Sequence, residues 1–202
     1  MGRAAVKESL KPRKIPQQAR SIRTREEILE ATARLLNSYP LEEVSTNHIA
    51  RKTGISVGTL YKYYPNKDAI LTDLSLEYMR QDAELFAGIF ARCKGRQPHE
   101  LIDETVEALL EVHRKEARVR GVVYQNLERL RLVGEAEKTR RKIQEQGVSV
   151  FPDVNPAQMW VVMTTISSVV FSVSQLPSQH RDWEFARELC RRVLSSLLMP
   201  KS

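Results

Sequence analysis

The chain has 202 residues, of which 42% are hydrophobic and 28% charged, so it can bury a core in one domain or two small ones. Its formal net charge of +7 indicates an anionic partner. Its two cysteines, Cys93 and Cys190, show no metal-ligand or disulfide spacing, which excludes a disulfide-stapled secreted domain and a zinc module. This cysteine usage favours a reducing cytoplasm, and the N-terminus lacks the apolar core of a signal peptide.

The positive charge is concentrated at the N-terminus. Residues 1–23 contain seven basic residues and one acid, and the remaining residues are almost neutral. A short basic arm on a near-neutral body is typical of a tail that follows phosphates. A disordered, solubilising tail is the alternative.

The first predicted helix covers residues 24–37. Thr24-Arg25-Glu26-Glu27 has the form of a capping box, with a hydroxyl at the N-cap and a carboxylate three residues later. Apolar residues then follow at helical spacing, and Tyr39-Pro40 ends the helix.

Two short helices are predicted next. Ser45 or Thr46 caps the first, and Gly54 follows it where a left-handed residue is expected. Ser56 caps the second, which covers residues 57–64 and ends before Pro65. Two short helices joined by a tight glycine-containing turn predict a helix-turn-helix.

Helices are predicted through the rest of the chain, with no internal repeat. Asn66 caps a helix that runs toward Phe90, and Asn155-Pro156 starts a later one. The segment 154–178 has no formal charge, but polar residues and two prolines interrupt it, so we expect a buried interface helix rather than a membrane span. The remaining helices are predicted at 99–116, 117–132, 135–146, 156–175 and 180–198.

The second short helix has the features of a recognition helix. Its N-terminal residues would meet base edges in the major groove. Thr59 can hydrogen-bond a base or a phosphate, and Val57 can contact a thymine methyl group. Gly58 is a poor helix former but permits close approach to DNA.

Other polar side chains of this region are candidate DNA contacts. Lys67 lies in the first turn of a helix, where the macrodipole disfavours a cation but where a bound phosphate would be favoured. A solvated surface lysine is the alternative for Lys67, and plain capping is the alternative for Thr46. The complete set of candidate DNA contacts is Thr46, Asn47, Val57, Gly58, Thr59, Tyr61, Lys62, Tyr63 and Lys67.

The stretch VSTNHIARKTGISVGTLYKYYPNKDAIL, residues 44–71, resembles the DNA-binding segment of the tetracycline-repressor (TetR) family. The shared pattern is a hydroxyl residue, Ile-Ala, Gly-hydrophobic-Ser, Gly-Thr-Leu-Tyr, an aromatic residue and Asn-Lys-Asp. The resemblance covers about residues 24–75 and implies the DNA contacts given above. Lys62 occupies a position that varies in the family, so its phosphate contact is inferred from its charge alone.

The resemblance implies an all-α fold with three parts: a basic arm at 1–23, a helix-turn-helix domain at 24–75, and a helical regulatory and dimerisation domain at 76–202. It further implies a homodimer on a palindromic operator and a small-molecule inducer. We expect no metal or other cofactor, because no metal-ligand spacing occurs. The last two long helices would form the dimer interface, which the spacing of large and small residues allows. Its candidate residues are Trp160, Thr164, Ser168, Phe171, Trp183, Ala186, Cys190, Val193 and Leu197. A core within one chain is the alternative for this surface.

A ligand cavity in the regulatory domain is implied in the same way. Candidate lining residues by type and position are Phe86, Phe90, His113, Tyr124 and Met163, and ordinary core is the alternative for each. The acidic side chains on the helix that carries His113 are expected to be a solvated face.

Three alternatives to a ligand-released repressor remain. An enzyme is disfavoured because the four histidines have no metal-like spacing and no nucleophile elbow, phosphate loop or dinucleotide fingerprint occurs. A helix-turn-helix regulator controlled by a protein partner or by its abundance would need no inducer. An activator would have the same sequence features as a repressor.

Overall fold

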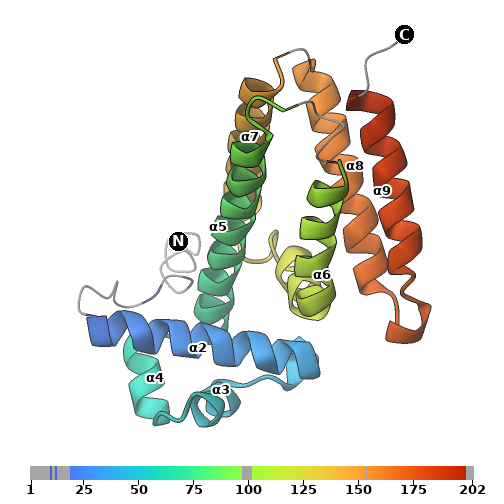
Figure 1. Cartoon of the computed structure of the whole chain (residues 1–202). Helices are drawn as coiled ribbons and strands as arrows, with labels where there is room; N and C mark the ends of the chain where they lie inside the picture. Colours follow the sequence, from blue (N-terminus) through green and yellow to red (C-terminus); the bar gives the residue numbers. More distant parts are fainter. Residues whose placement is uncertain (1–9, 11, 13–18, 97–101, 153, 199–202) are drawn as a thin grey trace. The chain divides into compact units, whose positions relative to one another are not determined.

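The computed structural model describes residues 10, 12, 19–96, 102–152 and 154–198. Within these ranges the chain is helical, with no β-strand, as Figure 1 shows. The predicted all-α fold is therefore confirmed. The elements are α2 (Ala19–Ser38), the 3-10 helix η1 (Leu41–Glu43), α3 (Thr46–Thr53), α4 (Val57–Tyr63), α5 (Lys67–Cys93), α6 (Ile102–Gln125), α7 (Val133–Val150), α8 (Pro156–Gln175), the 3-10 helix η3 (Ser178–His180) and α9 (Trp183–Leu198).

The chain divides into two compact units that do not follow the predicted domain boundaries. The first unit spans Met1–Tyr78 and Arg118–Val133, and the second spans Met79–Ala117 and Gly134–Ser202. The boundary after Tyr78 lies close to the predicted one at 75. The segment Arg118–Val133, however, belongs to the first unit and not to a contiguous regulatory domain.

The core of the first unit is built on α2, with α3 and α4 on one side of it (Figure 1). One face of α2 buries its apolar side chains, because they recur every three to four residues. Ile49 of α3 and Leu60 of α4 are fully buried in the same unit. Burying one such side chain contributes about 1.5–3 kcal/mol, so this shared core holds two helices that are too short to be stable alone.

The start of α2 differs from the prediction. The helix begins at Ala19, and the Thr24 hydroxyl donates to the carbonyl oxygen of Arg20 at 3.0 Å inside it. The capping-box interpretation of Thr24 is therefore wrong, because a hydroxyl bonded to the carbonyl four residues earlier is a helix-interior arrangement. The last residues of the predicted basic arm are helical, and most of the arm lies outside the described residues.

The two helices predicted at 99–116 and 117–132 are a single element, α6, with a break. Glu116 has non-helical φ and ψ of −126° and 21°, at the predicted junction. The amide of Val119, in the first turn after the break, donates to Oδ1 of Asn37 at 3.1 Å. Asn37 is the penultimate residue of α2, so its side chain caps a helix segment distant in sequence.

The second unit packs α6, α8 and α9 around one apolar core. Val162, Ile166 and Val170 of α8 face this core at helical spacing, and Ala186 and Cys190 of α9 meet them. Asn155 caps α8 in a capping box with Gln158, and Pro156 is its first residue, as predicted. By length and composition α8 could cross a membrane, but the core helix of a globular protein satisfies the same criterion.

The predicted acidic face of α6 is paired with arginines of the same unit. Asp103 is paired with Arg191 of α9, and Glu104 with Arg92 of α5. These side chains stay about half exposed, so each pair contributes roughly 0–1 kcal/mol. The face is both solvated and ion-paired, which the helix pattern alone did not predict.

Candidate nucleic-acid interface

The turn between α3 and α4 is built by local capping. The Ser45 hydroxyl, not that of Thr46, accepts from the amide of His48 at 3.2 Å and starts α3. Gly54 ends α3 at φ +79°, in the left-handed region that glycine adopts without steric cost. The amide of Ile55 donates back to the carbonyl oxygen of Ala50 at 3.1 Å, which closes the turn.

Helix α4 presents one face to solvent and buries the other. Leu60 and the C-terminal capping residue Tyr64 have no exposed surface. Val57 and Tyr61, also four residues apart, are 37% and 40% exposed. Because residues four apart share a helix face, the rotation of α4 is fixed with Val57, Gly58 and Tyr61 outward.

On this exposed face, a pair of hydroxyl groups links α3 to α4. The Tyr61 hydroxyl lies 3.2 Å from Oγ1 of Thr46, across the turn. The amide of Thr59 donates to Oγ of Ser56 at 3.0 Å, and the two hydroxyl oxygens are 2.8 Å apart. The first turn of α4 is therefore held rigidly by its cap, with Thr59 half-buried beside the exposed residues.

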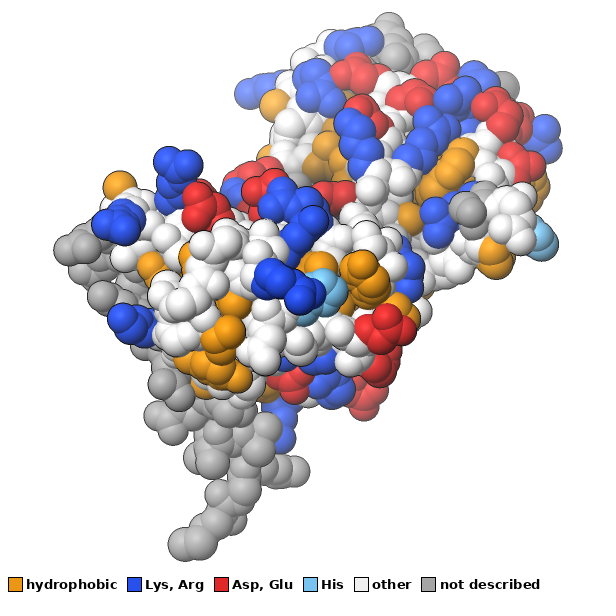
Figure 2. All heavy atoms as spheres, turned by 90° about the horizontal axis from the view of Figure 1, so that it is seen from below, with side chains coloured by type: hydrophobic (Ala, Val, Ile, Leu, Met, Phe, Trp, Pro, Cys, Tyr) orange, Lys and Arg blue, Asp and Glu red, His pale blue; other side chains and the backbone are white. Residues whose placement is uncertain are grey.

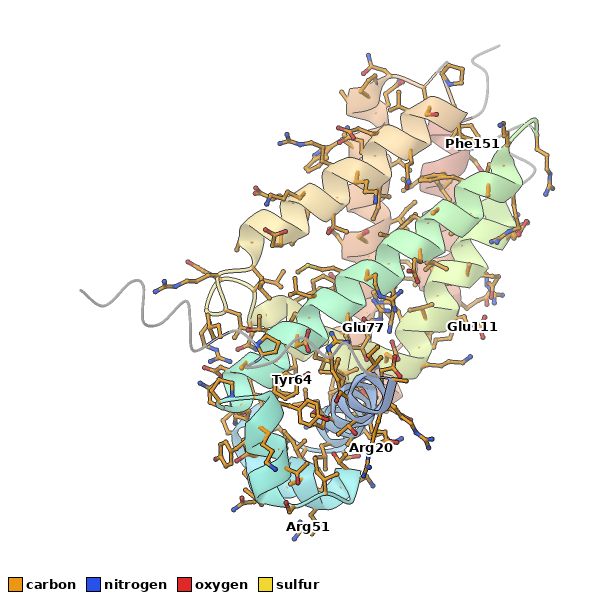
Figure 3. All side chains as sticks on the ribbon, turned by 90° about the vertical axis from the view of Figure 1, so that its left-hand side faces the viewer. Arg20, Arg51, Tyr64, Glu77, Glu111 and Phe151 are labelled. Atoms are coloured by element: carbon orange, nitrogen blue, oxygen red, sulfur yellow. The ribbon has the colours of Figure 1, made fainter. Side chains whose placement is uncertain are left out.

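The charge of this face is wholly positive. Between Val44 and Asn66 the sequence has three basic residues, Arg51, Lys52 and Lys62, and no acid. All three side chains are exposed. Figure 2 looks onto this side and shows basic and apolar side chains at its centre, with acidic ones at the edges. Figure 3 shows Arg51 at the outer end of α3, pointing away from the core. Arg51 and Lys52 were not among the predicted contacts, although a basic pair just before the glycine of the turn could have indicated phosphate contacts from the sequence.

Lys67 has a structural partner as well as a charge. Its Nζ donates to the carbonyl oxygen of Leu41 at 2.7 Å and so joins the start of α5 to η1. This bond uses one of the three ammonium hydrogens. The helix starts from Asn66, whose side chain accepts from the amide of Ala69 at 2.8 Å, as predicted.

The predicted contact residues are all brought into the first unit. Asn47 and Lys62 are exposed, while Tyr63 is half-buried. Among the described residues no group of three or more His, Cys, Asp or Glu could hold a metal ion.

The candidate ligand-lining residues are divided between the two units. Phe86 and Phe90 belong to the second unit, with ring centroids 6.1 Å apart, and His113 is half-buried in the same unit. Tyr124 lies in the first unit. The side chain of Met163 lies outside the described residues.

The predicted dimer residues of α8 and α9 separate into exposed and buried sets. Trp160, Thr164 and Ser168 are exposed, whereas Phe171, Trp183 and Val193 are half-buried. Ala186 and Cys190 are 0% and 1% exposed within the chain's own core, so we withdraw them from the predicted interface. The side chain of Leu197 lies outside the described residues.

Two exposed apolar residues of the same helices were missed by sequence reasoning. Val161 of α8 is 52% exposed and Phe185 of α9 is 60% exposed. Each is followed directly by a buried apolar residue, and the spacing of apolar residues along a helix does not distinguish a face toward the core from a face toward a partner. Exposed large apolar side chains on neighbouring helices are typical of an interaction surface.

Residues 28–74 match the family described as bacterial regulatory proteins, tetR family. This N-terminal segment is similar to the TetR family. An HTH-type transcriptional regulator of Staphylococcus aureus is 28% identical over 89 residues, which are 43% of this chain and 46% of that protein. The match thus spans about half the length of this relative. These similarities are to regulatory proteins and not to enzymes.

Solved structures of TetR-family proteins share the fold over most of the chain. The Thermus thermophilus repressor FadR, solved with lauroyl-CoA, has a TM-score of 0.59 at 20% identity and covers 88% of this chain and 96% of its own. A Mesorhizobium loti protein assigned to the TetR family has a TM-score of 0.72 at 17% identity, covering 90% and 98%. At these identities the likeness establishes the fold alone.

Proposed function

We propose that this protein is a cytoplasmic transcriptional regulator of the TetR type that binds a palindromic operator as a homodimer and is released from it by a small molecule. We place it with repressors. The observation that carries the DNA-binding part is the exposed face of α3 and α4, which is free of acidic residues and rigidly capped. A face built for packing would bury Val57 and Tyr61, yet both are exposed.

In this proposal α4 enters the major groove with its N-terminal end against the bases. Val57 contacts a thymine methyl group, and Thr59 hydrogen-bonds a base or a phosphate. Tyr61 and Tyr63, with Thr46 and the exposed basic side chains of both helices, contact the sugar–phosphate backbone. The direct base readout rests on few groups, since Val57 and Gly58 offer no side-chain hydrogen bond.

The proposed dimer forms through the exposed apolar surface of α8 and α9, which includes Trp160, Val161 and Phe185. Two copies related by a two-fold axis would place two recognition helices about 34 Å apart, one helical turn of DNA. That geometry predicts a palindromic operator.

The proposed inducer acts by binding more tightly to a conformation that cannot hold DNA. A shift from almost fully competent to almost fully released needs about 5.5 kcal/mol of differential affinity. Support for a small-molecule ligand comes from the related fold of FadR, which was solved with lauroyl-CoA. The aromatic pair of half-buried Phe86 and buried Phe90 offers apolar contacts for such a molecule.

Selection of duplexes from random DNA by the purified full chain tests the proposal. We expect a palindromic consensus, bound at two chains per duplex as measured by analytical ultracentrifugation. Candidate inducers, including lauroyl-CoA, are then added to the complex, and the active one should release the duplex. Enrichment of no sequence would refute the DNA-binding part, whereas an asymmetric consensus would refute only the dimer.

A further inference from the structure

A buried polar network fixes the end of α4. Helix α4 has seven residues and so is about 10 Å long, too short to hold its own orientation. Its buried anchors are Leu60 and, at the C-cap, Tyr64. Figure 3 shows Tyr64 pointing inward from the end of α4 toward the core of its unit.

The Tyr64 hydroxyl has a specific acceptor on α5. It donates to Oδ2 of Asp73 at 2.5 Å. Arg25 of α2 donates to the same carboxylate through Nε to Oδ2 and Nη2 to Oδ1, both at 2.7 Å. The three side chains therefore join α2, the C-terminus of α4 and α5, all within the first unit.

The burial of this network makes its geometry strict. The side chains of Asp73 and Arg25 are 8% and 26% exposed, and Tyr64 is fully buried. Burial raises the pKa of Tyr64 above its usual range, with a further increase from the Asp73 charge, so its hydroxyl remains a donor. The hydrogen bond to Asp73 raises the pKa of Arg25, so the guanidinium stays charged. Charge-assisted bonds in a buried site are short and directional, which an apolar contact is not.

We infer that Tyr64, Asp73 and Arg25 are positioning residues for operator recognition, because together they set the angle at which α4 leaves the core. None of them is among the proposed DNA contacts. A phenylalanine at position 64 would fill the same apolar space, so the hydroxyl supplies orientation and not volume. The inference rests on the proposed function, in which α4 reads the operator.

The test compares Tyr64→Phe with Tyr78→Phe in the full chain. Tyr78 is a buried tyrosine of α5 in the same unit, 3% exposed, whose ring lies 4.8 Å from the Arg120 guanidinium carbon. In Tyr64→Phe the Asp73 carboxylate keeps both bonds to Arg25, so the variant should fold. Affinities are measured for the duplex selected by the wild-type protein and for a scrambled duplex, well below the unfolding temperature of every variant.

We expect Tyr64→Phe to weaken binding to the selected duplex by about tenfold, the order of one hydrogen bond to a charged group. Binding to the scrambled duplex should be unchanged, since the phosphate contacts tolerate a small rotation. Tyr78→Phe should leave both affinities unchanged. In backbone NMR spectra of free Tyr64→Phe, the amides of α4 should shift while those of α3 do not.

A second variant keeps the test independent of folding problems at position 64. Arg25→Lys preserves the charge but cannot make the two-point bond, so it should lower the same affinity, and the double variant should lose less than the two single losses combined. Equal affinity of Tyr64→Phe and wild type for the selected duplex, or equal losses on both duplexes, overturns the inference. A wild-type protein that prefers no duplex overturns the proposed function, and the inference with it.

Discussion

Replacing Gly58 by alanine should raise the stability of the fold and lower its affinity for DNA. Gly58 is the second residue of α4, and a Cβ built there meets only Oγ of Ser56, at an ordinary 3.9 Å. Alanine therefore fits, and it favours a helix over glycine by about 0.5–1 kcal/mol. For a chain of this size that is a rise in melting temperature of about 1–4 °C.

The same methyl group would stand between α4 and the DNA. Gly58 is exposed beside Val57 and Tyr61, on the face proposed to enter the groove. Loss of close approach should cost about 1–3 kcal/mol in specific binding, as for a mismatched base pair. Stability is measured by thermal unfolding, and affinity by titration of the selected duplex at fixed salt.

Gly134→Ala is a matched control. Gly134 is also the second residue of a helix, α7, and also follows a valine; it is exposed, with nothing within 4 Å of a built Cβ. We expect a similar rise in melting temperature with unchanged DNA affinity. A Gly58→Ala protein that binds with wild-type affinity would remove Gly58 from the interface. A lower melting temperature would refute the view that this glycine costs stability.

Three further predictions concern other contacts. Lys67→Ala should lower the free energy of unfolding by about 1 kcal/mol, because the hydrogen bond to the Leu41 carbonyl is lost. It should also reduce the slope of log affinity for DNA against log salt concentration by about one unit. An unchanged slope would mean that Lys67 makes only its structural hydrogen bond and does not contact phosphate. Asn37→Ala should remove the cap on Val119 and cost about 1 kcal/mol in thermal unfolding, and an unchanged melting temperature would contradict that role. Val161→Glu, at an exposed position of α8, should give folded monomers in analytical ultracentrifugation, so persistent dimers would place the interface elsewhere.

Sequence reasoning located the two short helices and the turn between them because this architecture is local. Ser56 and the amide it caps are three residues apart, and Gly54 bonds within the turn it ends. Chain chemistry alone therefore located the helix-turn-helix and separated Leu60 from Tyr61. Sequence reasoning was wrong about Thr24, because the same capping pattern there lies inside a longer helix. The local sequence does not determine how far that helix extends toward the N-terminus.

The sequence by itself determined the helical class, the turn between α3 and α4, and the capped start of α8, since each depends on interactions within a few residues. Only the tertiary structure decided that Arg118–Val133 joins the first unit and that Ala186 and Cys190 face the chain's own core. It alone paired Arg25 with Asp73 across 48 residues. Such contacts depend on how whole helices pack. A periodic apolar stripe predicts that one face of a helix is buried, but it does not predict which other helix covers that face.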